Sequence, residues 1–323
     1  MTQAFSSLTT IHVGGVPEAI HVANTRDELI AIAKDVWKRT ENFLVLGGGS
    51  NLVANDELPG LEVIRVCNLG VEHVGNGIIR VQAGENWNDF VIHAAKSGWP
   101  GIESLAGIPG TVGAAPVQNI GAYGQELSLT FHQLEFLDYE TETVQLMSKE
   151  DCEFGYRDSI FKRGKKGIIT WVEFKFETDL PAEHKELLES RVQEVLALRT
   201  SKGMVLNDAD HDTWSCGSFF TNPIVTEQFA RTLPEDAPSW PTLEDDGVTV
   251  KLSAAWLIEN SGFSKGFSMP GSNAAISSKH ALAITNRGNA TAKEVTELAR
   301  YIQTQVANTF GITLVPEPNL IGF

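Results

Sequence analysis

The sequence predicts an α+β protein with two or three domains. Its 323 residues, at roughly 150 residues per domain, favour two domains and allow three small ones. Segments with strand periodicity and segments with helix periodicity are mixed along the chain. The 29 glycines exceed an average share and gather in a few loops, so their positions are informative.

The first segment, up to about residue 68, is expected to form a small α+β unit. Thr25 and Glu28 have the spacing of a helix-capping box. Apolar side chains then recur at helical spacing, at Leu29, Ile32, Ala33 and Val36. Two apolar runs, 43–46 and 62–66, predict short strands on either side of a glycine-rich turn.

The next stretch mixes strands and helices. Residues 78–83 predict a strand, and 88–97 predict a helix that ends at Gly98. A charged amphipathic helix is predicted over 183–200. Its apolar stripe is formed by Leu187, Leu188, Val192, Val195 and Leu196. Further strands are predicted at 134–139, 143–147 and 168–176.

Between these elements lies a long loop, Gly107 to Gly124. It contains five glycines and two prolines and shows neither helical nor strand periodicity. Loops longer than about 12 residues inside a domain are usually functional. This loop is therefore a candidate binding element.

The last third of the chain begins with a polar, acidic segment, 203–216, which predicts a crossing between domains. A helix is predicted at 252–261, ended by Gly262. The last helix begins at a capping box formed by Thr291 and Glu294. Its apolar face carries Val295, Leu298, Ile302 and Val306, and a strand is predicted at 312–315.

Charge and composition exclude several classes of protein. There are 25 Lys+Arg and 41 Asp+Glu, so the formal net charge is 25 − 41 = −16. This charge opposes non-specific nucleic-acid binding and docking on an anionic membrane. The excess acid is expected at the surface, at 208–212, 235–236 and 244–246. No apolar run approaches the ~20 residues that span a bilayer.

The start of the chain and the cysteines indicate a cytoplasmic protein. The first residues lack the basic and apolar regions of a secretory signal. The three cysteines, Cys67, Cys152 and Cys216, are widely spaced and odd in number. This pattern argues against a disulfide framework and against a CxxC zinc site.

Other patterns that carry chemistry fail on spacing. The run 208–212 resembles the start of a calcium loop, but its sixth position is Thr213 and its twelfth is Phe219. The eight histidines form no HxH or HxxxH pair, so no metal site is predicted. There is no G-x-S-x-G nucleophile elbow. Cys216 is a candidate nucleophile for which the sequence names no charge partner.

Glycine-rich loops can bring backbone N–H groups together around a phosphate. The loop 47–51, Gly-Gly-Gly-Ser-Asn, follows a predicted strand but has neither the dinucleotide fingerprint nor a Walker A lysine. A tight turn is the alternative for this loop alone. Together with the loop 107–124, it indicates an extended ligand that contains a pyrophosphate, such as a dinucleotide.

A basic cluster spans 157–166, with five basic groups and one acid. A solvated face is the expectation for Lys162 to Lys166. Arg157 differs because it follows the turn Phe154-Gly155-Tyr156. A guanidinium at such a place can hold a carboxylate with two parallel hydrogen bonds.

Five stretches, in order, together resemble the UDP-N-acetylenolpyruvoylglucosamine reductase family. They are 47–51, 107–124, 154–161, 217–223 and Pro316-Glu317. The resemblance covers essentially the whole chain. It implies a three-domain α+β flavoenzyme of peptidoglycan precursor synthesis. Residues 1–68 and 69–205 would form a two-part vanillyl-alcohol-oxidase-type (PCMH) FAD-binding module, to which 318–323 could return, and 206–317 a smaller α+β substrate-binding domain.

The resemblance implies FAD as cofactor and NADPH as the co-substrate that reduces it. The reduced FAD would pass a hydride to C3 of the enolpyruvyl ether of UDP-N-acetylglucosamine, which yields UDP-N-acetylmuramate. FAD would be held by the two glycine loops and by the backbone of Ile169. The residues concerned in the loops are Gly47, Gly48, Gly49, Ser50, Asn51, Pro109, Gly110, Gly113, Ala114, Asn119, Gly121 and Ala122.

The resemblance also assigns catalytic roles. Arg157 and Glu317 would stabilise the negative charge that develops on the substrate, and Ser218 would protonate C2. The substrate contacts would be Tyr156, Lys202, Asn222 and His280. The expected protein is a cytoplasmic monomer that binds a UDP-sugar and NADPH, with no metal, nucleic acid or membrane partner.

The sequence departs from one branch of the family, whose site is covered by an inserted loop that bears a tyrosine. The region between Phe176 and Arg199 is short, and the tyrosines are Tyr123, Tyr139, Tyr156 and Tyr301. The cover is therefore absent or built from other residues, for example the segment 203–216 with Trp214.

Alternatives remain open at this point. The chain could be a flavin oxidase of the same superfamily that acts on an alcohol or a sugar, with FAD tethered through His or Cys. It could also be a non-catalytic module that binds nucleotide sugars. For single residues, Ser218 could cap a helix before Phe219, and Glu317 could be a surface acid. Lys202, Asn222 and His280 could simply be exposed.

Overall fold

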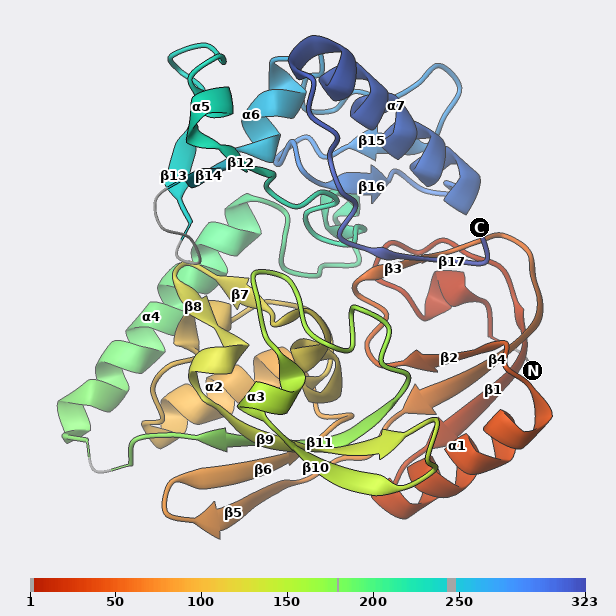
Figure 1. Ribbon diagram of the computed structural model, residues 1–323, viewed down its shortest axis with the longest axis vertical. Coiled ribbons are helices and arrows are strands. Elements are labelled where there is room, and N and C mark those ends of the chain that lie inside the picture. Colours follow the sequence, from red (N-terminus) through yellow and green to blue (C-terminus); the bar gives the residue numbers. More distant parts are fainter. Residues whose placement is uncertain (1–2, 179, 243–247) are drawn as a thin grey trace. The chain divides into compact units, whose positions relative to one another are not determined.

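The computed structural model describes residues 3–178, 180–242 and 248–323 (Figure 1). The chain divides into two compact units. Unit 1 is formed mainly by Val16–Gly49 and Leu58–Ser201, and unit 2 by Ala4–Gly15, Ser50–Glu57 and Lys202–Phe323. The predicted boundaries at 68 and 205 stay a prediction. In the described part of the chain, no helix is long and apolar enough to cross a membrane.

Unit 1 contains a three-stranded parallel sheet in the order β1–β4–β2. Its strands are β1 (Pro17–Ala23), β2 (Phe43–Leu46) and β4 (Leu58–Val66). Helix α1 (Arg26–Arg39) follows β1 and buries Leu29, Ala33 and Val36. Both predicted strands and the predicted helix are confirmed here.

The capping of α1 differs in one detail from the predicted box. The side chain of Thr25 accepts a hydrogen bond from the backbone N–H of Glu28 at 3.2 Å, as expected. The Glu28 carboxylate, however, accepts from the backbone N–H of Asn24 at 2.8 Å instead of closing back onto Thr25. The backbone N–H groups of Asn24 and Glu28 therefore both have partners at this end of the helix.

The second sheet of unit 1 is antiparallel, in the order β10–β9–β11–β6–β5. Its strands are β5 (Val71–Gly75), β6 (Ile78–Gln82), β9 (Phe131–Asp138), β10 (Val144–Ser148) and β11 (Gly167–Lys175). The predicted strands are confirmed with shifts of up to three residues at their ends. The remaining helices of the unit are α2 (Trp87–Ser97), α3 (Lys149–Cys152) and α4 (Ala182–Ser201), and a small hairpin is formed by β7 (Gly121–Ala122) and β8 (Gln125–Glu126).

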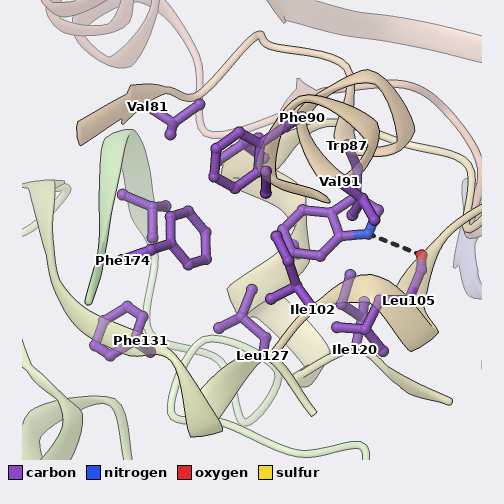
Figure 2. Packing of buried hydrophobic residues seen from close by; sticks show 14 of the residues in the cluster. Val81, Trp87, Phe90, Val91, Ile102, Leu105, Ile120, Leu127, Phe131 and Phe174 are labelled. Carbon is purple, nitrogen blue, oxygen red and sulfur yellow. Dashed lines mark hydrogen bonds between the residues drawn. The ribbon is translucent and has the colours of Figure 1, made fainter. Parts of the chain in front are cut away.

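The largest core of unit 1 lies between α2, the antiparallel sheet and the long loop (Figure 2). Trp87 is 1% exposed, and its indole N–H donates to the carbonyl of Leu105 at 3.2 Å. The rings of Phe90 and Phe174 pack with their centroids 5.0 Å apart. Burying a large apolar side chain contributes roughly 1.5–3 kcal/mol, so this cluster anchors the loop to the sheet.

Helix α4 adds only part of its predicted stripe to this core. Leu188, Val192 and Val195 are buried, whereas Leu187 is 65% exposed. The prediction for Leu187 is wrong because neighbouring residues on a helix point about 100° apart, and here Leu188 is the leucine that faces the core.

The loop 107–124 is more regular than the sequence predicts. It contains a 3-10 helix at Val112–Gln118, which ends at Asn119 with φ of +45°. The loop then enters the hairpin of β7 and β8. Periodicity of 3.6 residues cannot reveal a helix of three residues per turn, so the sequence predicts a loop where the structure has short regular elements.

The described residues of unit 2 form small sheets and three α-helices. Two strands from distant parts of the sequence, β3 (Leu52–Ala54) and β17 (Asn319–Ile321), pair in parallel. The other strands are β12 (Ile224–Thr226), β13 (Ser239–Pro241) and β14 (Thr249–Leu252) in one antiparallel sheet, and β15 (Ala274–Ile276) and β16 (Ile284–Asn286) in a hairpin. The helices are α5 (Glu227–Ala230), α6 (Ala254–Glu259) and α7 (Ala292–Phe310).

The prediction for α7 is confirmed in full. Thr291 and Glu294 form the reciprocal capping box, and the four predicted apolar positions are buried. Helix α6 is shorter than predicted, because β14 extends to Leu252 and Ser253 caps the helix.

The predicted strand at 312–315 is wrong. Ile312 and Leu314 alternate as in a strand and are buried, but they pack into the core that contains α7. The carbonyl of Leu314 accepts from the side chain of Gln303 on that helix at 2.8 Å. The burial pattern is that of a half-buried strand, but the segment is not part of a sheet.

Candidate active site

The two glycine loops meet in unit 1. A Cβ added to Gly48 would lie 2.8 Å from the Cα of Gly110, and one added to Gly47 would lie 2.5 Å from Oγ1 of Thr111. Both distances are shorter than van der Waals contact, so the backbones approach as closely as only glycine allows. Gly48 is therefore required by the packing of one loop on the other, and a side chain at position 47 would displace Thr111.

A cavity of about 190 Å3 lies beside this contact. Four of the predicted cofactor residues line it: Gly47, Gly113, Ala114 and Ile169. Most of the other lining residues are apolar, namely Val45, Val66, Ala83, Val117, Phe136 and Phe161. A Cβ on Gly113 would come within 2.5 Å of the Cβ of Ala83. An apolar cavity edged by glycine backbone suits an aromatic cofactor with phosphates, and the residues present therefore fit FAD.

One positively charged side chain lines the cavity. Lys165 lies there and forms an ion pair of 2.6 Å with Asp138, whose side chain is 7% exposed. The hydrogen bond from Lys165 is the main reason why the pKa of Asp138 lies below its ordinary value of 3.8. The expected solvated face is confirmed for Arg163 and Lys166, which are exposed, but not for Lys162 and Lys165, which are half-buried.

The loop that carries Tyr156 and Arg157 is tied to the glycine-rich loop. The side-chain amide of Asn119 donates to the carbonyl of Gly155 at 3.0 Å, and Ser159 Oγ donates to the carbonyl of Val117 at 2.6 Å. The Arg157 guanidinium donates to the carbonyl of Gly121. These three bonds join 155–159 to 117–121, so the loop that carries Arg157 and the glycine-rich loop 107–124 are held together.

Arg157 is placed in an uncommon way. Its backbone φ is +54°. Residues other than glycine rarely adopt this conformation, and those that do are often found at functional sites. Its guanidinium lies 5.3 Å from the ring centroid of Tyr156. The pair therefore combines a fixed charge with an aromatic face.

Asn119 is an interior residue of this site. Its side chain is 1% exposed, and its oxygen accepts from the backbone N–H of Ser128 at 3.0 Å. Its amide also donates to Glu126 at 3.1 Å. The side chain thus supports the loop from within, while its predicted contact with the cofactor stays a prediction, as it does for Gly49, Pro109, Gly121 and Ala122.

Two predicted catalytic residues come together in unit 2. The backbone N–H of Glu317 donates to the carbonyl of Phe219 at 2.9 Å, next to Ser218. Glu317 is half-buried, and no helix begins at Phe219 in the described chain. The helix-cap alternative for Ser218 is therefore wrong, while the catalytic role of Glu317 stays a prediction.

Asn51 belongs to the same group, since its side chain donates to the carbonyl of Glu317 at 3.3 Å. Ser50, like Asn51, lies in unit 2, whereas Gly47 to Gly49 lie in unit 1.

The predicted substrate contacts Lys202, Asn222 and His280 are half-buried residues of unit 2. Asn222 has a local task, because its side-chain oxygen accepts from the backbone N–H of Ala254 in the first turn of α6 at 3.0 Å. His280 lies in the loop between β15 and β16. Their contacts with a substrate stay predictions.

The segment 203–216 is the sequence-based alternative to the missing tyrosine loop. The ring of Trp214 lies 4.3 Å from the ring of His12 and 4.3 Å from that of His211, measured between centroids. Trp214 is thus packed between two histidines of its own unit. Its role in covering a site stays a prediction.

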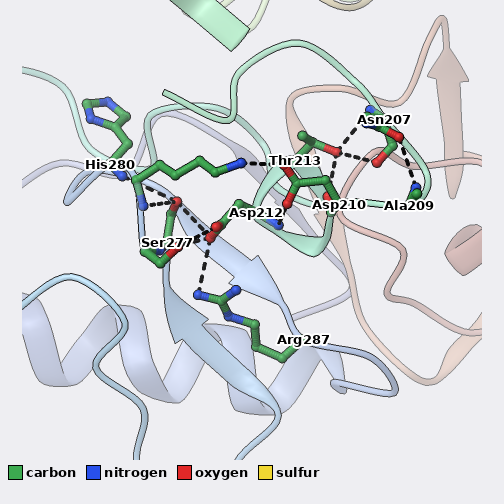
Figure 3. Close-up of polar contacts among 10 residues, drawn as sticks. Asn207, Ala209, Asp210, Asp212, Thr213, Ser277, His280 and Arg287 are labelled. Carbon is green, nitrogen blue, oxygen red and sulfur yellow. Dashed lines mark hydrogen bonds and ion pairs between the residues drawn. The ribbon is translucent and has the colours of Figure 1, made fainter. Parts of the chain in front are cut away.

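Asp212 is the residue that sequence reasoning missed. It was expected at the surface with 208–212, but it is 5% exposed and its carboxylate contacts Ser277, Ser278 and Arg287 (Figure 3). Burial acts to raise the pKa of Asp212, and the hydrogen bonds from Ser278 and Ser277 outweigh this effect, so the pKa lies below its ordinary value. Nothing in the local sequence distinguishes Asp212 from its exposed neighbour Asp208. Glu235 and Asp236 are exposed as expected, and 244–246 lie outside the described residues.

The candidate nucleophile Cys216 is not supported. It is 7% exposed, and its thiol donates to the carbonyl of Leu52 at 3.3 Å. Burial raises the pKa of Cys216 to about 12, so it is a thiol at neutral pH, and the thiolate is the reactive form. Among the described residues, no group of His, Cys, Asp and Glu could hold a metal ion.

Comparisons with known proteins define the class first. Residues 17–147 match the family model of the FAD binding domain. Residues 208–321 match the model of the UDP-N-acetylenolpyruvoylglucosamine reductase C-terminal domain. With the glycine loops and cavity of unit 1, these matches confirm the expected α+β flavoenzyme fold, and the chain is an FAD-binding oxidoreductase.

The particular family follows from full-length relatives. The chain is 45% identical to UDP-N-acetylenolpyruvoylglucosamine reductase of Leifsonia xyli subsp. xyli, over 99% of this chain and 98% of the relative. It is 42% identical to the protein of the same name from a Mycobacterium species (strain MCS), over 99% and 95%. A crystal structure of UDP-N-acetylenolpyruvylglucosamine reductase from Thermus caldophilus is similar with a TM-score of 0.72 and 28% identity, covering 99% of this chain and 98% of that one. The chain belongs to the UDP-N-acetylenolpyruvoylglucosamine reductase family.

Proposed function

We propose that this protein reduces the enolpyruvyl ether of UDP-N-acetylglucosamine enolpyruvate to UDP-N-acetylmuramate, with NADPH as reductant and FAD as cofactor. The observation that carries the proposal is the contact of the two glycine loops beside an apolar cavity, within the part that matches FAD binding domains. Family membership over the full length supports the substrate. A monomeric, cytoplasmic enzyme of peptidoglycan precursor synthesis is part of this proposal.

When bound, FAD supplies a hydride to C3 of the substrate after it has received one from NADPH. The chain's own task in this step is to hold the cofactor. Backbone N–H groups of the loops at Gly47–Gly49 and Gly110–Ala114 would surround the pyrophosphate, and the apolar cavity would take an aromatic ring system. Neither task requires a positive net charge, which agrees with a chain of formal charge −16.

Addition of a hydride to C3 leaves an electron pair at C2, and the charge spreads into the adjacent carboxylate. Arg157 carries a permanent charge with a fork geometry that matches a carboxylate. Its tether to Gly121 fixes that fork before the substrate arrives. Groups fixed in advance are the ones that stabilise developing charge most strongly. Glu317, acting as a neutral acid, would donate a hydrogen bond to the same charge.

The electron pair at C2 must then take up a proton. Ser218 is proposed as the donor, so that one hydride at C3 and one proton at C2 saturate the double bond. A serine hydroxyl is a poor acid, and it serves here only because a carbanion at C2 is very basic and lies within hydrogen-bond distance. Tyr156, Lys202, Asn222 and His280 are proposed to bind the rest of the substrate.

No observation favours the oxidase alternative. Among the described residues that line the cavity there is no histidine or cysteine to which FAD could be tethered. An oxidase would also need a base at the reacting carbon, whereas Ser218 is proposed here as a proton donor.

An anaerobic flavin titration tests the proposal in two steps. NADPH should bleach the yellow protein, and UDP-N-acetylglucosamine enolpyruvate should restore the colour. Ser218→Ala should leave the first step within twofold and slow the second by about 10²–10⁴-fold, the usual contribution of a positioned proton donor. Ser264→Ala, at an exposed serine of the same unit, is the matched control. A protein that NADPH does not bleach, or a Ser218→Ala variant slowed equally in both steps, would contradict the proposal.

A further inference from the structure

Asp212 joins two segments that are far apart in the sequence of unit 2. It lies in a 3-10 turn at His211–Thr213. One carboxylate oxygen accepts from Ser277 Oγ at 3.0 Å and from the backbone N–H of Ser278 at 2.8 Å, and the other accepts from Ser278 Oγ at 2.5 Å. The guanidinium of Arg287 lies 3.2 Å from the same carboxylate. Figure 3 shows Ser277 and Arg287 on either side of the Asp212 carboxylate.

The first consequence is a fixed shape for the loop between β15 and β16. Ser277 donates to Asp212 and in turn accepts from the backbone N–H groups of Lys279 at 3.0 Å and His280 at 3.3 Å. The side chain of Lys279 also pairs with Asp210 at 2.5 Å. The turn that presents His280 is therefore shaped by a serine whose hydroxyl is oriented by Asp212.

The second consequence concerns the segment that leads from Asp212 to Ser218. The backbone N–H of Asn286 donates to the carbonyl of Trp214 at 2.9 Å, and the N–H of Phe219 donates to the carbonyl of Leu282 at 2.7 Å. Both ends of the segment 212–219 are thus bonded to the same β15–β16 hairpin. The position of Ser218 depends on that hairpin, and Asp212 is the buried charge that fixes one to the other.

We propose that Asp212 is a positioning residue for the substrate half of the reaction, which holds Ser218 and the His280 loop in register. This inference rests on the proposed function, because it takes Ser218 as the proton donor. In this role Asp212 acts through Ser218 and the His280 loop. A buried carboxylate is stable only with its hydrogen-bond partners in place. Other arrangements of the two segments would leave Asp212 without these partners and would therefore be higher in free energy.

Replacement by asparagine keeps the shape and removes the charge. In Asp212→Asn, one oxygen becomes an amide that faces donors, and Arg287 loses its anion. We expect the step in which the substrate restores the flavin colour to slow by at least about tenfold, while reduction by NADPH stays within twofold. The matched control is Asp208→Asn, at an exposed aspartate of the same segment, which should change neither step. If Asp212→Asn does not fold, Ser278→Ala removes one of its donors and should give the same selective loss in smaller measure.

Two readouts separate positioning from general damage. A displaced Ser218 hydroxyl makes proton transfer slower, so the solvent deuterium isotope effect on the substrate step should rise in Asp212→Asn. The loss should also be non-additive with that of Ser218→Ala, because a residue that acts through Ser218 has nothing to position once the hydroxyl is gone. The double variant should therefore be about as slow as Ser218→Ala alone.

Each outcome decides one question. If the losses of the two single variants multiply in the double variant, or if the isotope effect is unchanged, Asp212 has a merely structural role and the inference is overturned. If Ser218→Ala alone leaves the substrate step unchanged, the proposed role of Ser218 fails, and this inference fails with it. Selective slowing with a raised isotope effect and non-additivity supports positioning.

Discussion

The backbone N–H of Glu317 donates a hydrogen bond to the carbonyl oxygen of Phe219 at 2.9 Å. Through this bond, an acid near the end of the sequence lies beside the residue that follows Ser218. The carbonyl of Glu317 is in turn held by the side chain of Asn51 at 3.3 Å. Three separate stretches of sequence are thus joined at the backbone beside Ser218 and Glu317.

Glu317 is expected to matter for the substrate step only. Glu317→Ala should slow restoration of the flavin colour by about 10²–10³-fold, the usual loss when one group that stabilises developing charge is removed. Glu317→Gln should lose less, because an amide can still donate a hydrogen bond. Rapid-mixing measurements of both half-reactions check this. Glu297→Gln, at an exposed residue of α7, should behave as wild type, and equal losses in the Ala and Gln variants would contradict the donor role.

Gly48→Ala is expected to weaken FAD binding, because the new methyl group would press on the backbone of Gly110 and separate the two loops. Overpacking of this kind typically costs about 1–3 kcal/mol, which corresponds to roughly a five- to 150-fold rise in the dissociation constant for FAD if the cofactor needs the loops together. The quenching of flavin fluorescence measures it.

The matched control for Gly48 is Gly124→Ala. Gly124 has φ of +85° and no atom within 4 Å of an added Cβ. This variant therefore introduces backbone strain without a steric clash. It should lose stability with little change in FAD affinity. Equal affinity for FAD in both variants would show that the loop contact is unimportant for the cofactor.

Asn119→Ala is expected to lower the stability of the folded protein strongly, although it removes only one side chain. It removes bonds to Gly155, Ser128 and Glu126, and each buried group left without its partner costs about 1–3 kcal/mol. The melting temperature should fall by several degrees, and the loop that carries Arg157 should become more susceptible to protease. Asn76→Ala, at another asparagine with positive φ (+52°), controls for the backbone conformation. A stability loss no larger than that of the control would refute the interior role of Asn119.

Thiol labelling should distinguish the three cysteines. Cys152 and Cys216 are buried, and burial raises the pKa of each to about 12. Cys67 is only partly buried. Native protein treated with iodoacetamide near neutral pH should therefore be modified at Cys67 first, and the others should react after denaturation. Mass spectrometry of the peptides reads the result. Labelling of native Cys216 before Cys67 would restore it as a candidate nucleophile.

The Asp138–Lys165 pair should contribute to the stability of the fold in a pH-dependent way. The hydrogen bond from Lys165 lowers the pKa of Asp138 below 3.8 in the folded state. The unfolded chain therefore binds this proton at higher pH than the folded one. The stabilisation is present above the ordinary pKa and is lost as pH falls through the lowered value.

Asp138→Asn should accordingly be less stable than wild type at about pH 7, and the two should converge as pH falls below the ordinary carboxyl value. Urea denaturation at a series of pH values measures the difference. A difference in unfolding free energy that stays constant down to about pH 3 would show that the charge of Asp138 does not stabilise the fold.

Local features explain what could be predicted from the sequence. The cap at Thr291 and the face from Val295 to Val306 depend on residues within one helix, and α7 matches its prediction. Glycines at 47, 48 and 113 mark sites of close approach to Thr111, Gly110 and Ala83.

The features that were not predicted depend on partners far along the chain. Asp212 is buried only because Ser277 and Ser278 come to it, and no local pattern reports that. The alternation of Ile312 and Leu314 indicates burial on one side, but the side chain that binds Leu314 comes from α7. Asn119 is a residue type that is common in turns, but its structural role depends on three hydrogen bonds to residues elsewhere in unit 1.

The pairing of β17 with β3 has a consequence for how the protein is made. Unit 2 combines residues before 60 with residues up to 321, so its parallel pair cannot close until almost the entire chain has left the ribosome. Most of unit 1 is complete by Ser201 and can fold during synthesis. The cofactor loops could thus be assembled on the nascent chain, while the group around Ser218 and Glu317 forms last and depends on slow, non-local contacts.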